Sequence, residues 1–208
     1  EFRDENNELK GFDIEMMETI AEKIGKKIEW VDMPFDSLIP SLLANKIDLV
    51  VAGLSWTPER AKRVAFSENY EISISAFVAA EGNDSLRGMG DIKGKTIAVQ
   101  LGTVQETYLH SLDGVTVKSF QKFDDCVREV ILGRADATFM DTPVAKSYVG
   151  HDSFAGKIKI AFEEEIKGEG KAIAMNLGEN ELLEAVNNAL EELSNSGELF
   201  ELMTKWFE

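Results

Sequence analysis

Short runs of apolar residues alternate with amphipathic stretches along the whole chain. An apolar run too short for a helix is typical of a buried strand, and apolar positions three or four residues apart mark one face of a helix. Regular alternation of the two is typical of βα units built around mainly parallel sheets. The pattern therefore predicts an α/β fold.

The first series of elements opens with a helix that Asp13 can cap and Gly25 can end. The apolar positions of this helix share one face: Ile14, Met17, Ile20 and Ile24. Four further elements are expected in this series: a helix at 38–43 and strands at 28–31, 48–53 and 72–80. The strand at 48–53 has no polar face, which predicts a central position in its sheet.

The pattern then restarts. Strands are expected at 95–100, 115–119, 135–140, 158–162 and 172–176. Helices are expected at 104–112, 124–132, 180–194 and 198–207. Thr142-Pro143 begins a further short helix, because proline suits a first turn, and Gly197 separates the last two helices.

Two similar series of strands and helices predict two lobes. One strand leads from the first series into the second and another leads back, so the chain crosses between the lobes twice. We expect the two crossings near 79–81 and 172–175. Lobe 1 is then discontinuous, residues 1–79 plus 175–208, and lobe 2 is residues 80–174. Small molecules commonly bind in the cleft between two such lobes.

Composition and charge exclude several classes of protein. Apolar residues make up 44% and charged residues 29% of the 208 residues, which is ordinary for a globular protein. The longest nearly charge-free stretch, 72–80, is far shorter than the roughly 20 residues of a membrane span. With 22 Lys and Arg against 38 Asp and Glu, the net charge is −16, and nucleic acid is a poor partner. Cys126 is the single cysteine, so no internal disulfide can form, and we expect a small core residue.

Motifs for common chemistries are absent from the sequence. Gly94-Lys95-Thr96 is no phosphate loop, because position 89 is Met and the stretch enters a predicted strand. His110 and His151 have no metal-binding spacing, and no nucleophile elbow is present. We therefore expect no cofactor, no metal and no catalytic residue.

Two turns and one strand end remain as candidate binding features. Leu101-Gly102-Thr103, between a strand and a helix, can present N–H groups to an anion. The stretch 53–60 follows another strand, and there Thr57 can cap a helix opened by Pro58 while Arg60 grips a carboxylate. Asp141 ends a third strand and could pair with an ammonium. Together these groups suit the two charged ends of an α-amino acid.

Several stretches also carry a resemblance: GFDIEM at 11–16, FDSLIPSL at 35–42, KID at 46–48, TPER at 57–60, VAFSENY at 64–70, GKTIAVQLGT at 94–103 and KWF at 205–207. In these the sequence resembles, over essentially its whole length, the amino-acid-binding components of polar amino acid ABC transporters, solute-binding protein family 3. The resemblance implies a two-lobed, periplasmic-binding-protein-like (type II) fold. Each lobe would be a mainly parallel sheet flanked by helices, and two hinge crossings would join the lobes.

The resemblance also implies roles at the carboxylate end of a bound amino acid. Arg60 would grip the carboxylate, helped by Ser55 and by the backbone N–H groups of Thr103 and Val104.

The remaining roles concern the other parts of the ligand. Asp141 and the Gly53 carbonyl would take the ammonium, and Phe35 would stack against the side chain. Gln100 and Gln105 would line the second lobe and read the end of that side chain.

On this basis we expect a non-catalytic extracytoplasmic binding protein, periplasmic or lipid-anchored, with a signal peptide in its precursor. It would capture one polar L-amino acid, with a cationic one (Arg, Lys or His) favoured and Gln next, and deliver it to an ABC permease. We expect a monomer that closes around its ligand because only the closed form lets both lobes touch it. Two alternatives stay open. One is the ligand-binding sensor domain of a receptor. The other is a cyclohexadienyl-dehydratase-like enzyme, which would need a carboxylate in the cleft as general acid.

Overall fold

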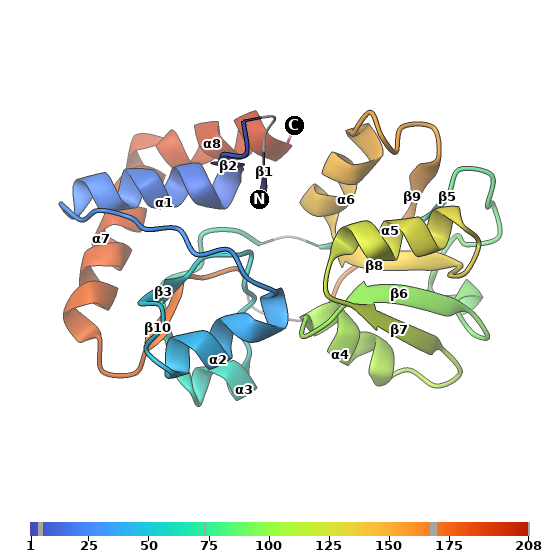
Figure 1. Ribbon diagram of the computed structural model, residues 1–208, viewed down its shortest axis with the longest axis horizontal. Coiled ribbons are helices and arrows are strands. Elements are labelled where there is room, and N and C mark those ends of the chain that lie inside the picture. The colour runs from blue at the N-terminus through green and yellow to red at the C-terminus, as the bar shows by residue number, and fades with distance from the viewer. Residues whose placement is uncertain (4–5, 73, 167–169, 208) are drawn as a thin grey trace. The chain divides into compact units, whose positions relative to one another are not determined.

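The computed structural model describes residues 1–3, 6–72, 74–166 and 170–207. The chain divides into two compact units (Figure 1). The first unit comprises Glu1–Met33, Ser37–Ile72 and Gly168–Glu208, and the second comprises Pro34–Asp36 and Ser73–Lys167. The stretches at 79–81 and 172–175, where we expected the crossings, lie respectively inside the second unit and inside the first.

The first unit combines helices with short strands. Its helices are α1 (Phe12–Lys23), α2 (Leu38–Leu43), α3 (Pro58–Ala61), α7 (Asn180–Ser196) and α8 (Glu198–Phe207). Its strands are β1 (Phe2–Arg3), β2 (Leu9–Lys10), β3 (Leu49–Val50), β4 (Val64–Phe66) and β10 (Ala174–Asn176). The first two strands form a small antiparallel hairpin. The other three form a sheet in the order β3-β10-β4, with β10 antiparallel to both neighbours.

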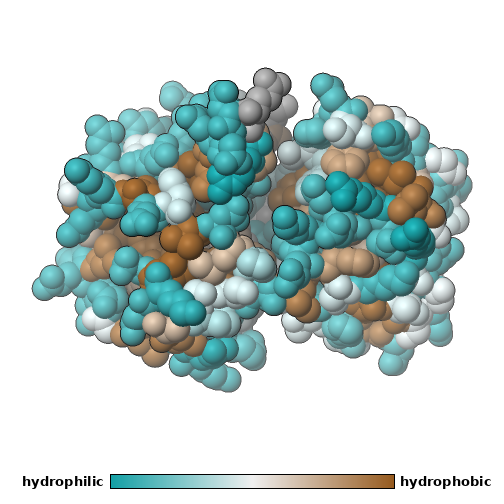
Figure 2. Space-filling view, in the orientation of Figure 1, coloured by the Kyte–Doolittle hydropathy of each residue, from teal (hydrophilic) through white to brown (hydrophobic). Residues whose placement is uncertain are grey.

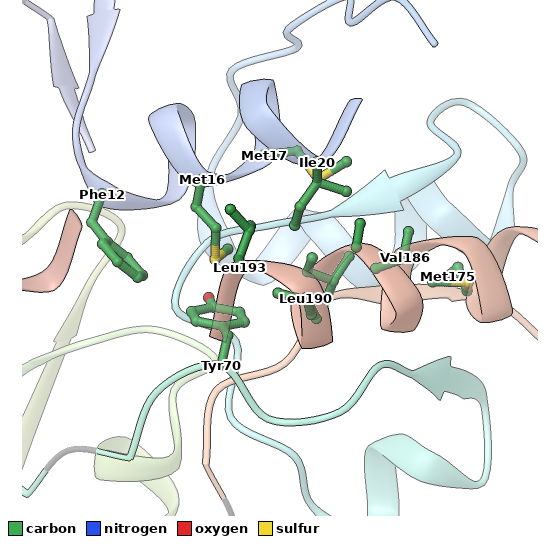
Figure 3. Close-up of a cluster of buried hydrophobic side chains, with 11 residues drawn as sticks. Phe12, Met16, Met17, Ile20, Tyr70, Met175, Val186, Leu190 and Leu193 are labelled. Carbon is green, nitrogen blue, oxygen red and sulfur yellow. The ribbon is translucent and has the colours of Figure 1, made fainter. Parts of the chain in front are cut away.

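The core of the first unit lies between α1, α7 and β10 (Figure 3). Met16 and Ile20 of α1 and Leu193 of α7 are fully buried there. Of the apolar face predicted for α1, Met17, Ile20 and Ile24 pack into this core, whereas Ile14 is buried outside the cluster. The α1 helix also lies beside α8, where the Glu15 carboxylate accepts hydrogen bonds from Lys205 Nζ (2.7 and 2.8 Å) and Trp206 Nε1 (2.8 Å) (Figure 1).

The second unit is a five-stranded sheet between two layers of helices. Its strands are β5 (Ser75–Ala80), β6 (Thr96–Gln100), β7 (Thr116–Phe120), β8 (Ala137–Asp141) and β9 (Ile158–Glu164). Its helices are α4 (Val104–His110), α5 (Phe123–Ile131) and α6 (Thr142–Gly150), with 3-10 turns at Phe35–Ser37, which the boundary between the units crosses, and at Met89–Asp91. The strand order is β7-β6-β8-β5-β9, in which β6 pairs parallel with β7 and β8, and β5 pairs antiparallel with both of its neighbours.

Alternate residues of each strand point to opposite faces of this sheet. Ala76 and Val78 of β5 pack against α5 and α6, together with Cys126. Phe77 points to the other face, towards α4, and its ring stacks on Phe139 with centroids 4.0 Å apart. Cys126 is fully buried, as expected, and this burial raises the pKa of its thiol to about 12.

Three local expectations are wrong. Residues 28–31 form no strand: Ile28 and Trp30 pack against the core, but the segment has no ladder partner among the described residues. The β3 strand is at the edge of its sheet rather than in the centre, because an apolar pattern reports burial on two faces and not the number of paired neighbours. Asp13 does not cap α1, because Gly11 stands at the cap and Asp13 is buried in the first turn.

The outer surface is mostly polar on the face that Figure 2 shows. Hydrophobic residues lie there in groups between hydrophilic ones. Among the described residues, no helix has the length and apolar character needed to cross a membrane.

Candidate functional site

The loop that follows β3 contains Gly53, which is anchored to α1. The Gly53 N–H donates to Asp13 Oδ2 at 2.6 Å, and the Tyr70 hydroxyl donates to the same oxygen at 3.1 Å. Gly53 has a φ of 55°, in the left-handed region that favours glycine. Asp13 is only 6% exposed, so its carboxylate is a structural anchor for this loop.

Residues 55–60 carry Arg60, the predicted carboxylate ligand of the first unit, and the local sequence explains their geometry. The Thr57 hydroxyl caps α3 by accepting from the Arg60 N–H at 3.2 Å, and Pro58 occupies the first turn, so the predicted cap is confirmed. The Arg60 guanidinium folds back, and its Nη1 donates to the Ser55 carbonyl oxygen at 2.6 Å. Burial lowers the pKa of Arg60 to about 10, so it still carries its charge at neutral pH.

A second cation, Lys171, lies beside the same serine and was missed in the sequence analysis. It is 5% exposed, and its Nζ donates to Ser55 Oγ at 3.0 Å. The signal in the sequence was a lysine directly before a run of apolar residues, because a charged side chain is seldom buried without a specific reason.

In the second unit, the turn after β6 is closed by its own side chains. Thr103 caps α4, accepting from the Glu106 N–H at 3.2 Å and donating to the Gln100 carbonyl oxygen at 2.7 Å. The Glu106 carboxylate in turn accepts from the Gly102 N–H at 2.7 Å. The arrangement is related to a capping box, but the Glu106 carboxylate reaches the N–H of Gly102, one residue before the cap, rather than that of Thr103. The N–H groups of Thr103 and Val104 lie at the start of the helix.

Asp141 stands where β8 ends and α6 begins, and Gln105 orients it. Gln105 Nε2 donates to Asp141 Oδ1 at 2.9 Å and to Ser75 Oγ at 3.1 Å. An ionised carboxylate only accepts, so the nitrogen of the Gln105 amide must face it. Gln105 is 3% exposed, and its amide is engaged inside the second unit.

Phe35 and Gln100 are the other two predicted site residues. Phe35 is half-buried in the 3-10 turn, within the short segment that belongs to the second unit. Gln100 ends β6, and its Nε2 donates to the Gln121 carbonyl oxygen at 3.1 Å.

The predicted residues thus form two sets, one in each unit. The first-unit set is Gly53, Ser55 and Arg60, and the second-unit set is Phe35, Gln100, Thr103, Val104, Gln105 and Asp141. The first set is cationic, and the second contains the carboxylate of Asp141. In the part of the chain that the structure describes, no cluster of His, Cys, Asp and Glu could hold a metal ion.

Comparison with known proteins shows what the whole chain is similar to. A family model described as bacterial extracellular solute-binding proteins, family 3, matches residues 1–208. The chain is 36% identical to the arginine-binding extracellular protein ArtP of Bacillus subtilis, over 98% of this chain and 80% of that protein. It is 32% identical to the histidine-binding periplasmic protein of Salmonella typhimurium, over 100% of this chain and 83% of that protein. Among solved structures, an ancestral arginine-binding protein bound to arginine matches with a TM-score of 0.93 at 41% identity, covering 100% of this chain and 92% of that one.

These similarities extend over the whole chain rather than over one motif. The two-lobed α/β fold expected from the sequence is confirmed by the likeness to the arginine-bound structure. The relatives named here are binding proteins.

Proposed function

The chain belongs to the bacterial extracellular solute-binding proteins of family 3, and we propose that it captures a polar L-amino acid for delivery to an ABC permease. The observation that carries this proposal is the position of the Arg60 guanidinium. Its guanidinium is charged and is held against the Ser55 carbonyl at the end of a short capped helix. A guanidinium fixed in this way is suited to a bidentate grip on a carboxylate.

The other end of the amino acid is assigned to the second unit. Asp141 supplies the negative charge for the ligand ammonium, together with the Gly53 carbonyl of the first unit. A carboxylate can accept about four hydrogen bonds, so the bond from Gln105 is compatible with this role. We assign Gln105 the task of orienting Asp141, in addition to its expected contact with the ligand side chain. The N–H groups of Thr103 and Val104 support the carboxylate, while Phe35 and Gln100 contact the side chain.

A cationic amino acid is the favoured ligand, with glutamine next. The relatives described above are named for binding arginine and histidine. The net charge of −16 also gives the protein a field that attracts cations. Those relatives are named as extracellular or periplasmic, and we propose the same extracytoplasmic location for this chain, as a monomer without catalytic activity.

The test is a thermal-shift panel of the twenty L-amino acids, on protein unfolded and refolded to remove bound ligand. At about a thousandfold over Kd, binding adds roughly 4 kcal/mol, which raises the midpoint by about 8–16 °C for a chain of this size. We expect such a shift with arginine, lysine, histidine or glutamine. Absence of a shift with all twenty, from protein shown to be folded, would refute the proposal.

Arg60→Ala is the matching variant, and Arg63→Ala is its control because Arg63 is exposed and close in sequence. We expect Arg60→Ala to lose most of the affinity for any amino acid in isothermal titration calorimetry. Arg63→Ala should bind like the wild type. Nanomolar binding by Arg60→Ala would show that the carboxylate is held elsewhere.

A further inference from the structure

The serine in the first-unit set lies between two cations. Arg60 Nη1 donates to its carbonyl oxygen at 2.6 Å, and Lys171 Nζ donates to its hydroxyl oxygen at 3.0 Å. Lys171 itself is 5% exposed, and Ser55 is 8% exposed. These contacts all lie within the first unit.

The main chain of Lys171 is held between two neighbouring segments. Lys171 forms antiparallel bridges with Ser55 on one side and with Glu71 on the other. Its N–H donates to the Glu71 carbonyl oxygen at 2.7 Å, and its carbonyl accepts from the Tyr70 N–H at 2.9 Å. Pairing with neighbours on two sides fixes the main chain of Lys171, and from there the buried side chain reaches the Ser55 hydroxyl.

The chemistry of the two groups fixes the direction of their hydrogen bond. An ammonium has three donors and no acceptor, so Ser55 Oγ must accept from Lys171. The hydroxyl proton of Ser55 is then directed to a different acceptor. A ligand carboxylate gripped by Arg60 is a negatively charged acceptor for this proton. The positive charge of Lys171, close to that of Arg60, adds to the electrostatic attraction between the site and the carboxylate.

We propose that Lys171 is a positioning residue that makes the site select ligands with an ionised α-carboxylate. It turns the Ser55 hydroxyl into a donor towards that carboxylate and adds a second cation beside Arg60. This inference rests on the proposed function, because it concerns the same ligand.

The experiment compares an amino acid with its carboxamide, which keeps the shape and loses the negative charge. L-arginine and L-argininamide are titrated into wild type and Lys171→Met by calorimetry. If another amino acid binds most tightly in the panel, that amino acid and its amide replace them. We expect Lys171→Met to lose about 10- to 100-fold in affinity for the acid, the worth of a hydrogen bond to a charged group, and less than about threefold for the amide.

Two further variants separate charge from hydrogen bonding and guard against misfolding. Lys171→Gln keeps a donor for Ser55 without the charge, and should retain part of the preference for the acid. Ser55→Ala removes the group through which Lys171 acts, so Lys171→Met should change the acid-to-amide ratio less in that background. Lys159→Met, at a surface lysine of the second unit, is the control and should leave the ratio unchanged.

The outcomes distinguish this inference from the proposed function. If wild type binds no amino acid, both are overturned. If wild type binds the acid but Lys171→Met and Lys171→Gln weaken acid and amide equally, Lys171 is only structural, and this inference alone fails. A collapse of the acid-to-amide ratio in Lys171→Met and a smaller fall in Lys171→Gln, with amide affinity kept in both, support it.

Discussion

Removing the Asp13 carboxylate tests whether the loop at Gly53 is anchored as the structure indicates. Asp13→Ala leaves the Gly53 N–H and the Tyr70 hydroxyl without the acceptor that both use, at 2.6 and 3.1 Å. Tyr70 is only 3% exposed, so water cannot readily replace the carboxylate there. Burial, with the neighbouring negative charge of Asp13, also raises the pKa of Tyr70, so its hydroxyl stays protonated and keeps donating.

The magnitude follows from these two orphaned donors. Each buried donor left unsatisfied costs about 1–3 kcal/mol, so losing the acceptor of two donors in Asp13→Ala should lower the free energy of unfolding by about 2–6 kcal/mol. For a chain of this length each kcal/mol lowers the unfolding midpoint by about 2–4 °C. Tyr70→Phe removes one of the two bonds together with its donor, and should cost about 1 kcal/mol.

Tryptophan fluorescence during urea unfolding is the suitable assay. All three tryptophans, Trp30, Trp56 and Trp206, lie in the first unit, so the signal reports the unit that contains Asp13. Asp13→Asn keeps an acceptor oxygen of the same shape, and should recover part of the loss. The double variant with Tyr70→Phe should cost less than the sum of the single changes, because both remove the same bond.

Two results would refute this reasoning. A loss below about 1 kcal/mol for Asp13→Ala would show that other groups satisfy the Gly53 N–H. Strict additivity with Tyr70→Phe would show that the hydroxyl does not depend on Asp13.

Two other predictions concern the helix contact of the first unit and the thiol of the second. Hydrogen bonds from Lys205, together with that from Trp206, hold the pKa of Glu15 below its usual 4.5. The ionised Glu15 carboxylate therefore stabilises the fold above pH 4.5, and this stabilisation is lost as the pH falls through the lowered pKa. Glu15→Gln should therefore cost about 0.5–1 kcal/mol in urea unfolding at pH 7 and progressively less towards about pH 3; a loss that does not depend on pH would contradict the ion-pair account. Cys126, with its raised pKa, should not react with a thiol reagent at pH 8 in folded protein, but should react stoichiometrically in denaturant, and rapid labelling of the folded protein would show that the core opens.

Elements with a strong period and clear ends were predictable. The helices α1, α5, α7 and α8 and the strands β6 to β8 lie within about three residues of the expected positions, because their apolar faces pack directly into a core. The strand expected at 28–31 fails for the opposite reason. A strand depends on a ladder partner elsewhere in the chain, and the local pattern carries no information about that partner.

The candidate site likewise contains a part that was predictable from the sequence and a part that was not. The capped turn of Thr57, Pro58 and Arg60 depends on neighbours within three residues, so its residue types were enough to predict it. Contacts between distant segments were not predictable. Gln105 meets Asp141 across 36 residues, Gly53 meets Asp13 across 40, and Lys171 meets Ser55 across 116.

Residue order therefore determined the family, most of the elements and the chemical character of the binding groups, because each depends on residues that lie close together in the sequence. Only the tertiary structure decided which groups anchor them. Asp13 holds a loop rather than capping a helix, and Lys171 reaches Ser55, because strand pairing and burial bring together segments whose separation along the chain leaves no local trace.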